Sequence, residues 1–156
     1  MIIETHLDFK KYLELCFTLT YRKPIVIIVT LVGICNIFWF FFPLESMTQP
    51  FVNIVGGIFL IAITPITVYI HASKFFNSNQ RVKEKIVYKF SDGKIKSIAE
   101  SSVIEFDYKN IYKTQELRNW FLIYHDIRSV NAIPKKQLDK SQVLELKDIL
   151  FKINKS

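Results

Sequence analysis

Two long stretches without charge constrain this chain more than any other feature. No Asp, Glu, Lys or Arg occurs in residues 24–44 or in residues 46–73, and both stretches are rich in Ile, Val, Leu and Phe. A helix that crosses a bilayer needs roughly 20 predominantly apolar residues. The alternative, two buried core helices, would leave too few other residues to cover them in a chain of 156. The sequence therefore predicts two transmembrane helices, at about residues 24–43 and 51–72.

The orientation of these helices follows from the basic residues around them. The connecting segment, residues 43–50, is short and carries one charge, Glu45, so the two helices should form an antiparallel hairpin. The ends of the hairpin opposite the connecting segment are flanked by basic residues: Lys10, Lys11, Arg22, Lys23, Lys74, Arg81, Lys83 and Lys85. Because Lys and Arg near membrane-spanning helices favour the cytoplasmic side, we expect a multi-pass membrane protein with both termini in the cytoplasm.

Polar residues within the hairpin suggest how its helices pack. Pro65 removes a backbone donor and frees the carbonyl of Ile61, which the hydroxyl of Thr30 should satisfy from the facing helix. Gly33 is expected near Ala62, where small residues permit close approach. A homo-oligomeric pore or transporter subunit is an alternative function, supported by Asn36, Pro65 and the glycines.

The chain divides into three expected regions: an N-terminal segment (1–23), the hairpin (24–73) and a cytoplasmic α+β domain (74–156). The N-terminal segment begins with a β-prone run, Met1–Ile3. An amphipathic helix is then expected from about His6 to Tyr21, because Thr5 and Asp8 have the spacing of a capping box.

The C-terminal region begins with an alternating pattern typical of β-strands. Residues 85–90 and 94–100 flank Asp92-Gly93, a strong signal for a two-residue hairpin turn. This turn pairs Phe90 with Ile95 and Tyr88 with Ser97. A second tight turn at Ser101-Ser102 would place Ser97 beside Phe106, Ala99 beside Ile104 and Lys96 beside Asp107.

Three more strands and a helix complete the prediction. The strands are expected at residues 111–115, 120–125 and 130–133, and Asp139 with Gln142 can cap a final helix. The apolar stripe of that helix consists of Val143, Leu146, Ile149, Leu150 and Ile153. The expected fold is an antiparallel sheet of five or six strands closed by one helix.

A family resemblance rests on residues 120–136. Trp120-Phe121-Leu122-Ile123-Tyr124, a short turn and then Ala132-Ile133-Pro134-Lys135-Lys136 resemble the YcxB-like membrane proteins. That family usually shows an aromatic shortly after the basic pair, where this chain has Gln137-Leu138. The resemblance implies a bacterial cytoplasmic (inner) membrane protein with a domain similar to a pleckstrin-homology (PH) fold, and it implies no catalytic residue.

Catalytic and metal-binding motifs are absent from the sequence. Two cysteines exclude a disulfide scaffold and a four-cysteine zinc site, and no phosphate-binding loop or His-Glu-x-x-His motif occurs. His125, Asp126 and Ser129 contain the residue types of a catalytic triad, but sequence neighbours are more typical of a turn. We therefore expect no enzyme, no metal and no cofactor, and keep a membrane-associated enzyme centred on His125 as an alternative.

The excess of basic residues suggests a partner. Lys and Arg outnumber Asp and Glu by 21 to 14. The candidate contacts with lipid headgroups are Lys89, Lys94, Lys96, Lys135 and Lys136. Lys89 should lie opposite Lys96, and either an anionic lipid or the neighbouring Asp107 can offset their repulsion. We expect a module that binds lipid or an unidentified protein, and no nucleic-acid binding because the charge forms no run.

Overall fold

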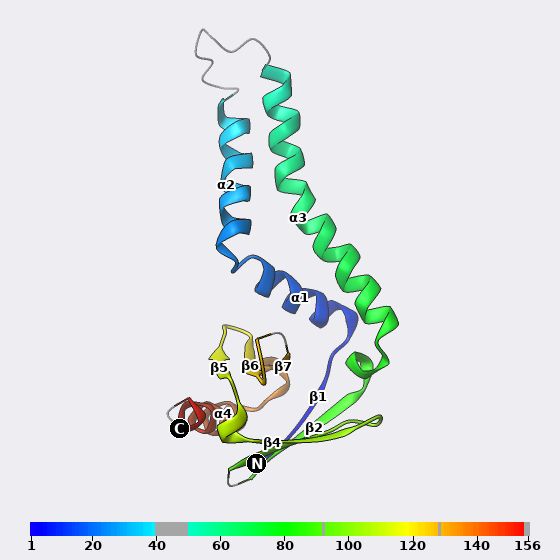
Figure 1. Ribbon diagram of the computed structural model, residues 1–156, viewed down its shortest axis with the longest axis vertical. Coiled ribbons are helices and arrows are strands. Elements are labelled where there is room, and N and C mark those ends of the chain that lie inside the picture. The colour runs from blue at the N-terminus through cyan, green and yellow to red at the C-terminus, as the bar shows by residue number, and fades with distance from the viewer. Residues whose placement is uncertain (40–49, 92, 128, 155–156) are drawn as a thin grey trace. The chain divides into compact units, whose positions relative to one another are not determined.

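The chain forms two compact units. The computed structural model describes residues 1–39, 50–91, 93–127 and 129–154. One unit contains residues 8–80 and is helical; the other combines residues 1–7 with residues 81–156 and contains two β-sheets. The chain thus leaves the sheet unit after its first strand, forms the entire helical unit, and returns. The two units are described separately below (Figure 1).

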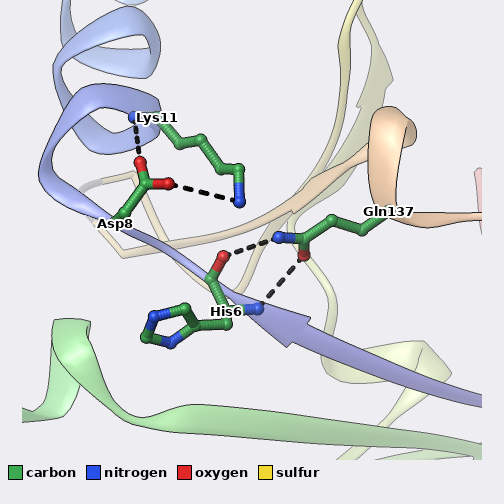
Figure 2. Close-up of polar contacts among 4 residues, drawn as sticks. All are labelled: His6, Asp8, Lys11 and Gln137. Carbon is green, nitrogen blue, oxygen red and sulfur yellow. Dashed lines mark hydrogen bonds and ion pairs between the residues drawn. The ribbon is translucent and has the colours of Figure 1, made fainter.

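The helical unit consists of α1 (Phe9–Thr20), α2 (Pro24–Trp39) and α3 (Pro50–Ser78). Helix α1 starts later than the sequence indicated. Its N-cap is Asp8, whose Oδ1 accepts the backbone N–H of Lys11 at 2.8 Å (Figure 2). The expected cap, Thr5, instead belongs to a strand, where its hydroxyl donates to the carbonyl of Ile86. Thr5 is buried by strand pairing, so its side chain is not available to a helix end.

Helices α2 and α3 lie side by side and touch at two glycines (Figure 1). A Cβ built on Gly57 would lie 2.7 Å from the carbonyl oxygen of Gly33, so the two backbones are in direct contact. Gly33 faces Gly57, Leu60 and Ile61, rather than Ala62 as expected. The expected bond from Thr30 to Ile61 is also wrong, because the Thr30 hydroxyl donates to Val26 of its own helix at 2.8 Å.

The apolar surface of these helices is exposed to the surroundings. Among the described residues, one helix, Phe51–Ser78, is long and apolar enough to cross a membrane. A second candidate is counted if α1 and α2, which meet at an angle of 83°, form one broken span. The end of the first expected span (40–43) and the connecting segment with Glu45 lie outside the described residues.

The larger sheet of the other unit has the strand order β1-β2-β3-β4 and is antiparallel. Its strands are β1 (Ile2–His6), β2 (Lys85–Ser91), β3 (Lys94–Ile98) and β4 (Val103–Asp107). Phe90 pairs with Ile95 and Tyr88 with Ser97, which confirms the register predicted for the first hairpin. Gly93 has a φ of 83°, the left-handed conformation that glycine adopts readily in such a turn. Asp92 lies outside the described residues.

The second hairpin has a different register from the predicted one. Ile98 pairs with Val103, so the connection contains residues 99–102 rather than two serines, and Ala99 N–H donates to the carbonyl of Ser102. The register is therefore displaced by two residues, and Lys96 lies opposite Glu105 instead of Asp107. A displacement of two keeps every side chain on its predicted face, because strand side chains alternate with period two.

A second, three-stranded antiparallel sheet follows, in the order β5-β6-β7. Its strands are β5 (Lys113–Glu116), β6 (Trp120–Tyr124) and β7 (Val130–Pro134). The prediction of a single sheet is wrong, because a 3₁₀ turn, η2 (Tyr108–Asn110), separates β4 from β5. Two further 3₁₀ turns, η1 (Gln80–Lys83) and η3 (Lys135–Gln137), precede β2 and follow β7.

Helix α4 (Lys140–Ile153) and both sheets share one hydrophobic core. The capping box at Asp139 and Gln142 is present as predicted. The core contains Ile3, Tyr88, Phe90, Ile95, Phe121, Ile123, Ile133, Leu146, Leu150 and Ile153. Val143 and Ile149 pack against it, so the predicted apolar stripe of α4 is confirmed as a core-facing surface. Residues from strand β1 and from helix α4 at opposite ends of the sequence therefore stabilise the same unit.

Candidate functional site

The candidate lipid contacts on the larger sheet lie on its solvent-facing side. We call this side the outer face; it carries Ile2, Glu4, His6, Lys85, Val87, Lys89, Ser91, Lys94, Lys96, Ile98, Val103, Glu105 and Asp107. Lys85 forms an ion pair with Glu4 at 3.1 Å. The opposite side, with Ile3, Tyr88 and Ile95, is buried in the core. Alternation along each strand thus places three of the five predicted lysines together on one exposed surface.

Lys94 is neutralised within the outer face. Its Nζ lies 2.7 Å from Oε1 of Glu105 and 4.0 Å from Oδ1 of Asp107. The hydrogen bond with Glu105 raises the pKa of Lys94, and the same bond lowers the pKa of Glu105. Because all three side chains are well exposed, this pair contributes little to stability. Its consequence is electrostatic, because Glu105, the cross-strand partner of Lys96, forms its ion pair with Lys94 instead.

Lys89 and Lys96 have no such partner. They are directly opposite each other on β2 and β3, and both side chains are exposed. Lys96 also lies opposite Glu105 on β4, but Glu105 forms its ion pair with Lys94. Within the described part of the chain, no carboxylate lies within ion-pair distance of Lys89 or Lys96. Like charges in this position repel, and Glu105 attracts Lys96 without forming an ion pair with it. We call Lys89 and Lys96 the cationic pair.

An apolar row borders this cationic pair. Val87, Ile98 and Val103 are cross-strand partners on β2, β3 and β4, two residues away from the lysines along β2 and β3. Val103 on the edge strand is 59% exposed, and Ile2, opposite Lys89 on β1, is 61% exposed. The outer face therefore combines two ammonium groups that form no ion pair within the described residues with accessible hydrocarbon, a combination suited to contact with lipid headgroups.

The other two predicted lysines lie apart, in the turn η3 that follows the smaller sheet. Lys135 Nζ is 2.6 Å from Oε1 of Glu116 and lies 4.5 Å from the ring centre of Phe121. Glu116 also pairs with Lys147 at 3.2 Å, and its hydrogen bond with Lys135 lowers its pKa. Only 18% of the Lys135 side chain is exposed, so this lysine stabilises a corner of the fold, whereas Lys136 is exposed.

His125, the residue considered for catalysis, is held between the two sheets. Its ring stacks on Phe106 of β4 with 3.6 Å between ring centres, and its Nε2 accepts a hydrogen bond from Asn131 Nδ2 at 2.7 Å. Burial lowers the pKa of His125, which opposes the weaker influence of Asp126. Asp126 accepts the backbone N–H of Ser129. The three residues thus form a turn, in which Ser129 contributes its backbone rather than its hydroxyl to these contacts.

The helical unit contains a groove that sequence reasoning did not identify. It has a volume of about 680 Å³ and lies between α1 and α3. Lys23, His71 and Lys74 are among the residues that line it. Lys23 and Lys74 are the last basic residue before the first charge-free stretch and the first after the second one. Their positions at the ends of the charge-free stretches could have indicated that both lysines lie at the same end of the hairpin. The groove itself also requires the bend between α1 and α2, which the sequence does not indicate.

No metal site is formed in the described part of the chain, because no three His, Cys, Asp or Glu side chains cluster there. Cys16 and Cys35 are free thiols. Comparison of the chain with protein-family models, with curated proteins and with solved structures finds no match. The resemblance to YcxB-like proteins therefore depends on the sequence motif alone.

Proposed function

We propose that this chain is a membrane-anchored protein whose sheet unit binds anionic lipid headgroups through its outer face. The observation that carries the proposal is the cationic pair of Lys89 and Lys96, neither of which forms an ion pair within the described residues, beside exposed hydrocarbon. Helices α2 and α3 are the proposed anchor. The membrane is the bacterial cytoplasmic membrane that the family resemblance implies, and a PH-like fold for the sheet unit agrees with its two antiparallel sheets and closing helix.

The anchor is supported by exposure and by topology. Only 6% of the most apolar 18-residue window of α3 is buried, so its hydrocarbon surface needs a partner, which a bilayer supplies. Strand β1 pairs with β2, which places residues 1–7 and 81–156 on the same side of any membrane. The segment between them must then cross an even number of times. A single crossing by α3 is incompatible with this pairing, which supports the proposal that α2 provides the return.

Anionic lipid is supported by the energetics of the lysine pair. Each basic residue near an anionic membrane surface contributes about 1 kcal/mol to binding. Two adjacent lysines thus give a modest affinity alone, but the anchor holds the sheet unit close to a bilayer, which raises its effective concentration. The bilayer is therefore the partner that matches both the charge of the outer face and the place where the anchor holds it.

The test uses the full-length protein in lipid nanodiscs. Cys16 and Cys35 are replaced by Ser, and a Val103→Cys variant carries a polarity-sensitive fluorophore on the outer face. We expect its emission to shift to the blue in nanodiscs rich in phosphatidylglycerol but not in phosphatidylcholine. The shift should disappear in the K89Q/K96Q variant and at about 1 M salt, where charges are screened within about 3 Å.

The matched control is K109Q/K140Q, which removes two exposed lysines away from the outer face. This variant should retain the blue shift. Equal loss in both variants would show a response to net charge and contradict the assignment to Lys89 and Lys96. If neither lipid composition shifted the emission, and an added membrane protein did, the result would favour a protein partner at the exposed edge strand β4 instead.

A further inference from the structure

The groove in the helical unit has one wall from α1 and another from α3. Val68 and Ala72 of α3, which are buried, line it together with Leu19 of α1 and Phe75 of α3. Contacts between Phe9 and Phe76 and between Tyr12 and Phe75, at 5.5 and 5.9 Å between ring centres, hold the two helices together. The chain bends by 83° between α1 and α2, and α1 packs against α3 (Figure 1).

The charged residues of this groove are all of one sign. Lys23 and Lys74 line it together with His71, and none of its lining residues is acidic. Within the described residues, neither lysine side chain has an ion-pair partner. Two unpaired ammonium groups at one concave site are an arrangement that attracts an anion, and Lys is a common ligand of phosphate.

Much of the remaining lining is suited to hydrocarbon. Leu19, Val68, Ala72 and Phe75 offer an apolar surface in the same groove as the two lysines, alongside polar residues such as Thr20 and Thr67. A free phosphate ion would leave that surface without a partner. A glycerophospholipid would satisfy both parts, because its phosphate carries the negative charge and its acyl chain covers the apolar residues. The groove therefore matches the two-part chemistry of a phospholipid better than that of a soluble anion.

The level of the groove agrees with this occupant. Lys23 immediately precedes the charge-free stretch that α2 contains, and Lys74 immediately follows the one that α3 contains. If these helices cross a bilayer, as proposed above, both lysines lie at the level of the cytoplasmic headgroups. We propose that the groove between α1 and α3 binds one anionic phospholipid, whose phosphate contacts Lys23 and Lys74 and whose acyl chain lies along Leu19 and Val68.

The experiment is native mass spectrometry of the full-length protein in detergent, titrated with phosphatidylglycerol or phosphatidylcholine. We expect one phosphatidylglycerol to bind in preference to phosphatidylcholine. K23Q/K74Q should weaken this binding about thirtyfold, the effect of losing two basic contacts with an anionic headgroup. The control K10Q/R22Q removes two exposed basic residues of the same unit that do not line the groove, and it should bind as the wild type does.

Further arms distinguish the possible failures. K23R/K74R retains the charge and should retain binding, so loss in K23Q/K74Q with recovery in K23R/K74R excludes misfolding as the cause. Equal weakening by the control, or no preference for the anionic lipid, would overturn the proposal. Competition by soluble glycerol phosphate at the same concentration as the lipid would also overturn it, because the acyl chain would then be irrelevant.

The anchor is tested separately by extracting membranes with alkaline carbonate. Release of the protein would contradict the anchor on which this groove proposal rests. Retention in the membrane without any preference for phosphatidylglycerol would contradict the groove proposal alone.

Discussion

At the scale of single residues, the environment of His125 makes stability sensitive to pH near neutrality. Asn131 Nδ2 can only donate, so Nε2 of His125 must accept and the ring must be neutral in this arrangement. Burial lowers the pKa of His125 in the folded state below its ordinary value of about 6.5. The unfolded chain therefore binds a proton more readily, and folding stability from this residue is complete above about pH 6.5 and decreases as the pH falls below it.

We therefore expect the free energy of unfolding of the wild type to decrease between about pH 7.5 and pH 5.5 more than that of His125→Gln. The measurement is chemical denaturation followed by the fluorescence of Trp120, which is buried in the sheet unit, in a Trp39→Phe background. The difference between the two curves removes the contribution of carboxylates that titrate in both proteins. Parallel curves would contradict a role for the neutral ring in stability.

Gln137 connects the two sheets through its side-chain amide. Its Oε1 accepts the backbone N–H of His6 at 3.1 Å, and its Nε2 donates to the His6 carbonyl at 2.7 Å (Figure 2). His6 is the last residue of β1, and Gln137 belongs to the turn η3 after β7. The amide therefore extends the hydrogen bonding of β1 beyond its pairing with β2.

Gln137→Ala should lower the free energy of unfolding by about 1–3 kcal/mol, since each of the two hydrogen bonds contributes about 0.5–1.5 kcal/mol. The same denaturation assay measures this change. Lys136→Ala, an exposed neighbour in the same turn, is the control and should change stability by less than about 0.5 kcal/mol. Equal effects of the two substitutions would mean that the turn itself, rather than the amide, stabilises this corner.

At the scale of elements, the contact of α2 with α3 depends on Gly57. A Cβ at this position would lie 2.7 Å from both the Gly33 carbonyl oxygen and Cγ1 of Ile37, and the backbone oxygen cannot move aside as a side chain can. Gly57→Ala should destabilise the helix pair by about 1–3 kcal/mol, the usual cost of overpacking. Thermal unfolding in detergent, followed by circular dichroism, measures the change.

The adjacent Gly56 is the matched control, because a Cβ there meets nothing within 4 Å. Gly56→Ala should be neutral or stabilising, since Ala has a higher helix propensity than Gly. Gly33→Ala should lie between the two, because its closest neighbours, Cγ1 of Ile61 at 2.9 Å and the Gly57 carbonyl oxygen at 3.1 Å, are farther away than those of Gly57. Equal destabilisation by all three substitutions would contradict a specific contact at Gly57.

Local patterns predicted those elements whose causes are local. The Asp-Gly turn determined the register of β2 with β3, and the Asp139 capping box marked the start of α4, because both signals act over a few residues. The β3–β4 register was wrong because two serines do not require a two-residue turn. The pairing of β1 with β2 could not be predicted at all, since its partners, such as Ile3 and Tyr88, are separated by the entire helical unit.

In the candidate site, too, local features could be predicted from the sequence and long-range contacts could not. Alternation along the strands predicted that Lys89 and Lys96 would share an exposed face. Whether they were neutralised depended on the β3–β4 register, which places Glu105 rather than Asp107 opposite Lys96 and pairs it with Lys94. The groove depends on the angle between α1 and α2, a tertiary property that no periodicity in the sequence indicates.

For the whole molecule, the insertion of the helical unit between β1 and β2 makes topology a testable consequence of strand pairing. In a protein without Cys16 and Cys35, a single cysteine introduced at Glu45 should react with a membrane-impermeant maleimide in intact cells. A cysteine introduced at Lys152, on the exposed side of α4, should react only after permeabilisation. The two positions differ in this way only if the chain crosses the membrane between them, and together with the β1–β2 pairing this requires a second crossing within residues 8–80.

A cysteine at Ile2 provides the internal control. Ile2 is exposed in β1 and belongs to the same unit as Lys152, so both positions must report the same side of the membrane. Agreement between Ile2 and Lys152, with the opposite result at Glu45, would establish the hairpin. Reaction at Ile2 but not at Lys152 in intact cells would require one crossing and the separation of β1 from β2, and it would contradict the pairing of residues 1–7 with the sheet unit. Protection of all three positions would place the whole chain on the cytoplasmic side and leave α2 and α3 without a spanning role.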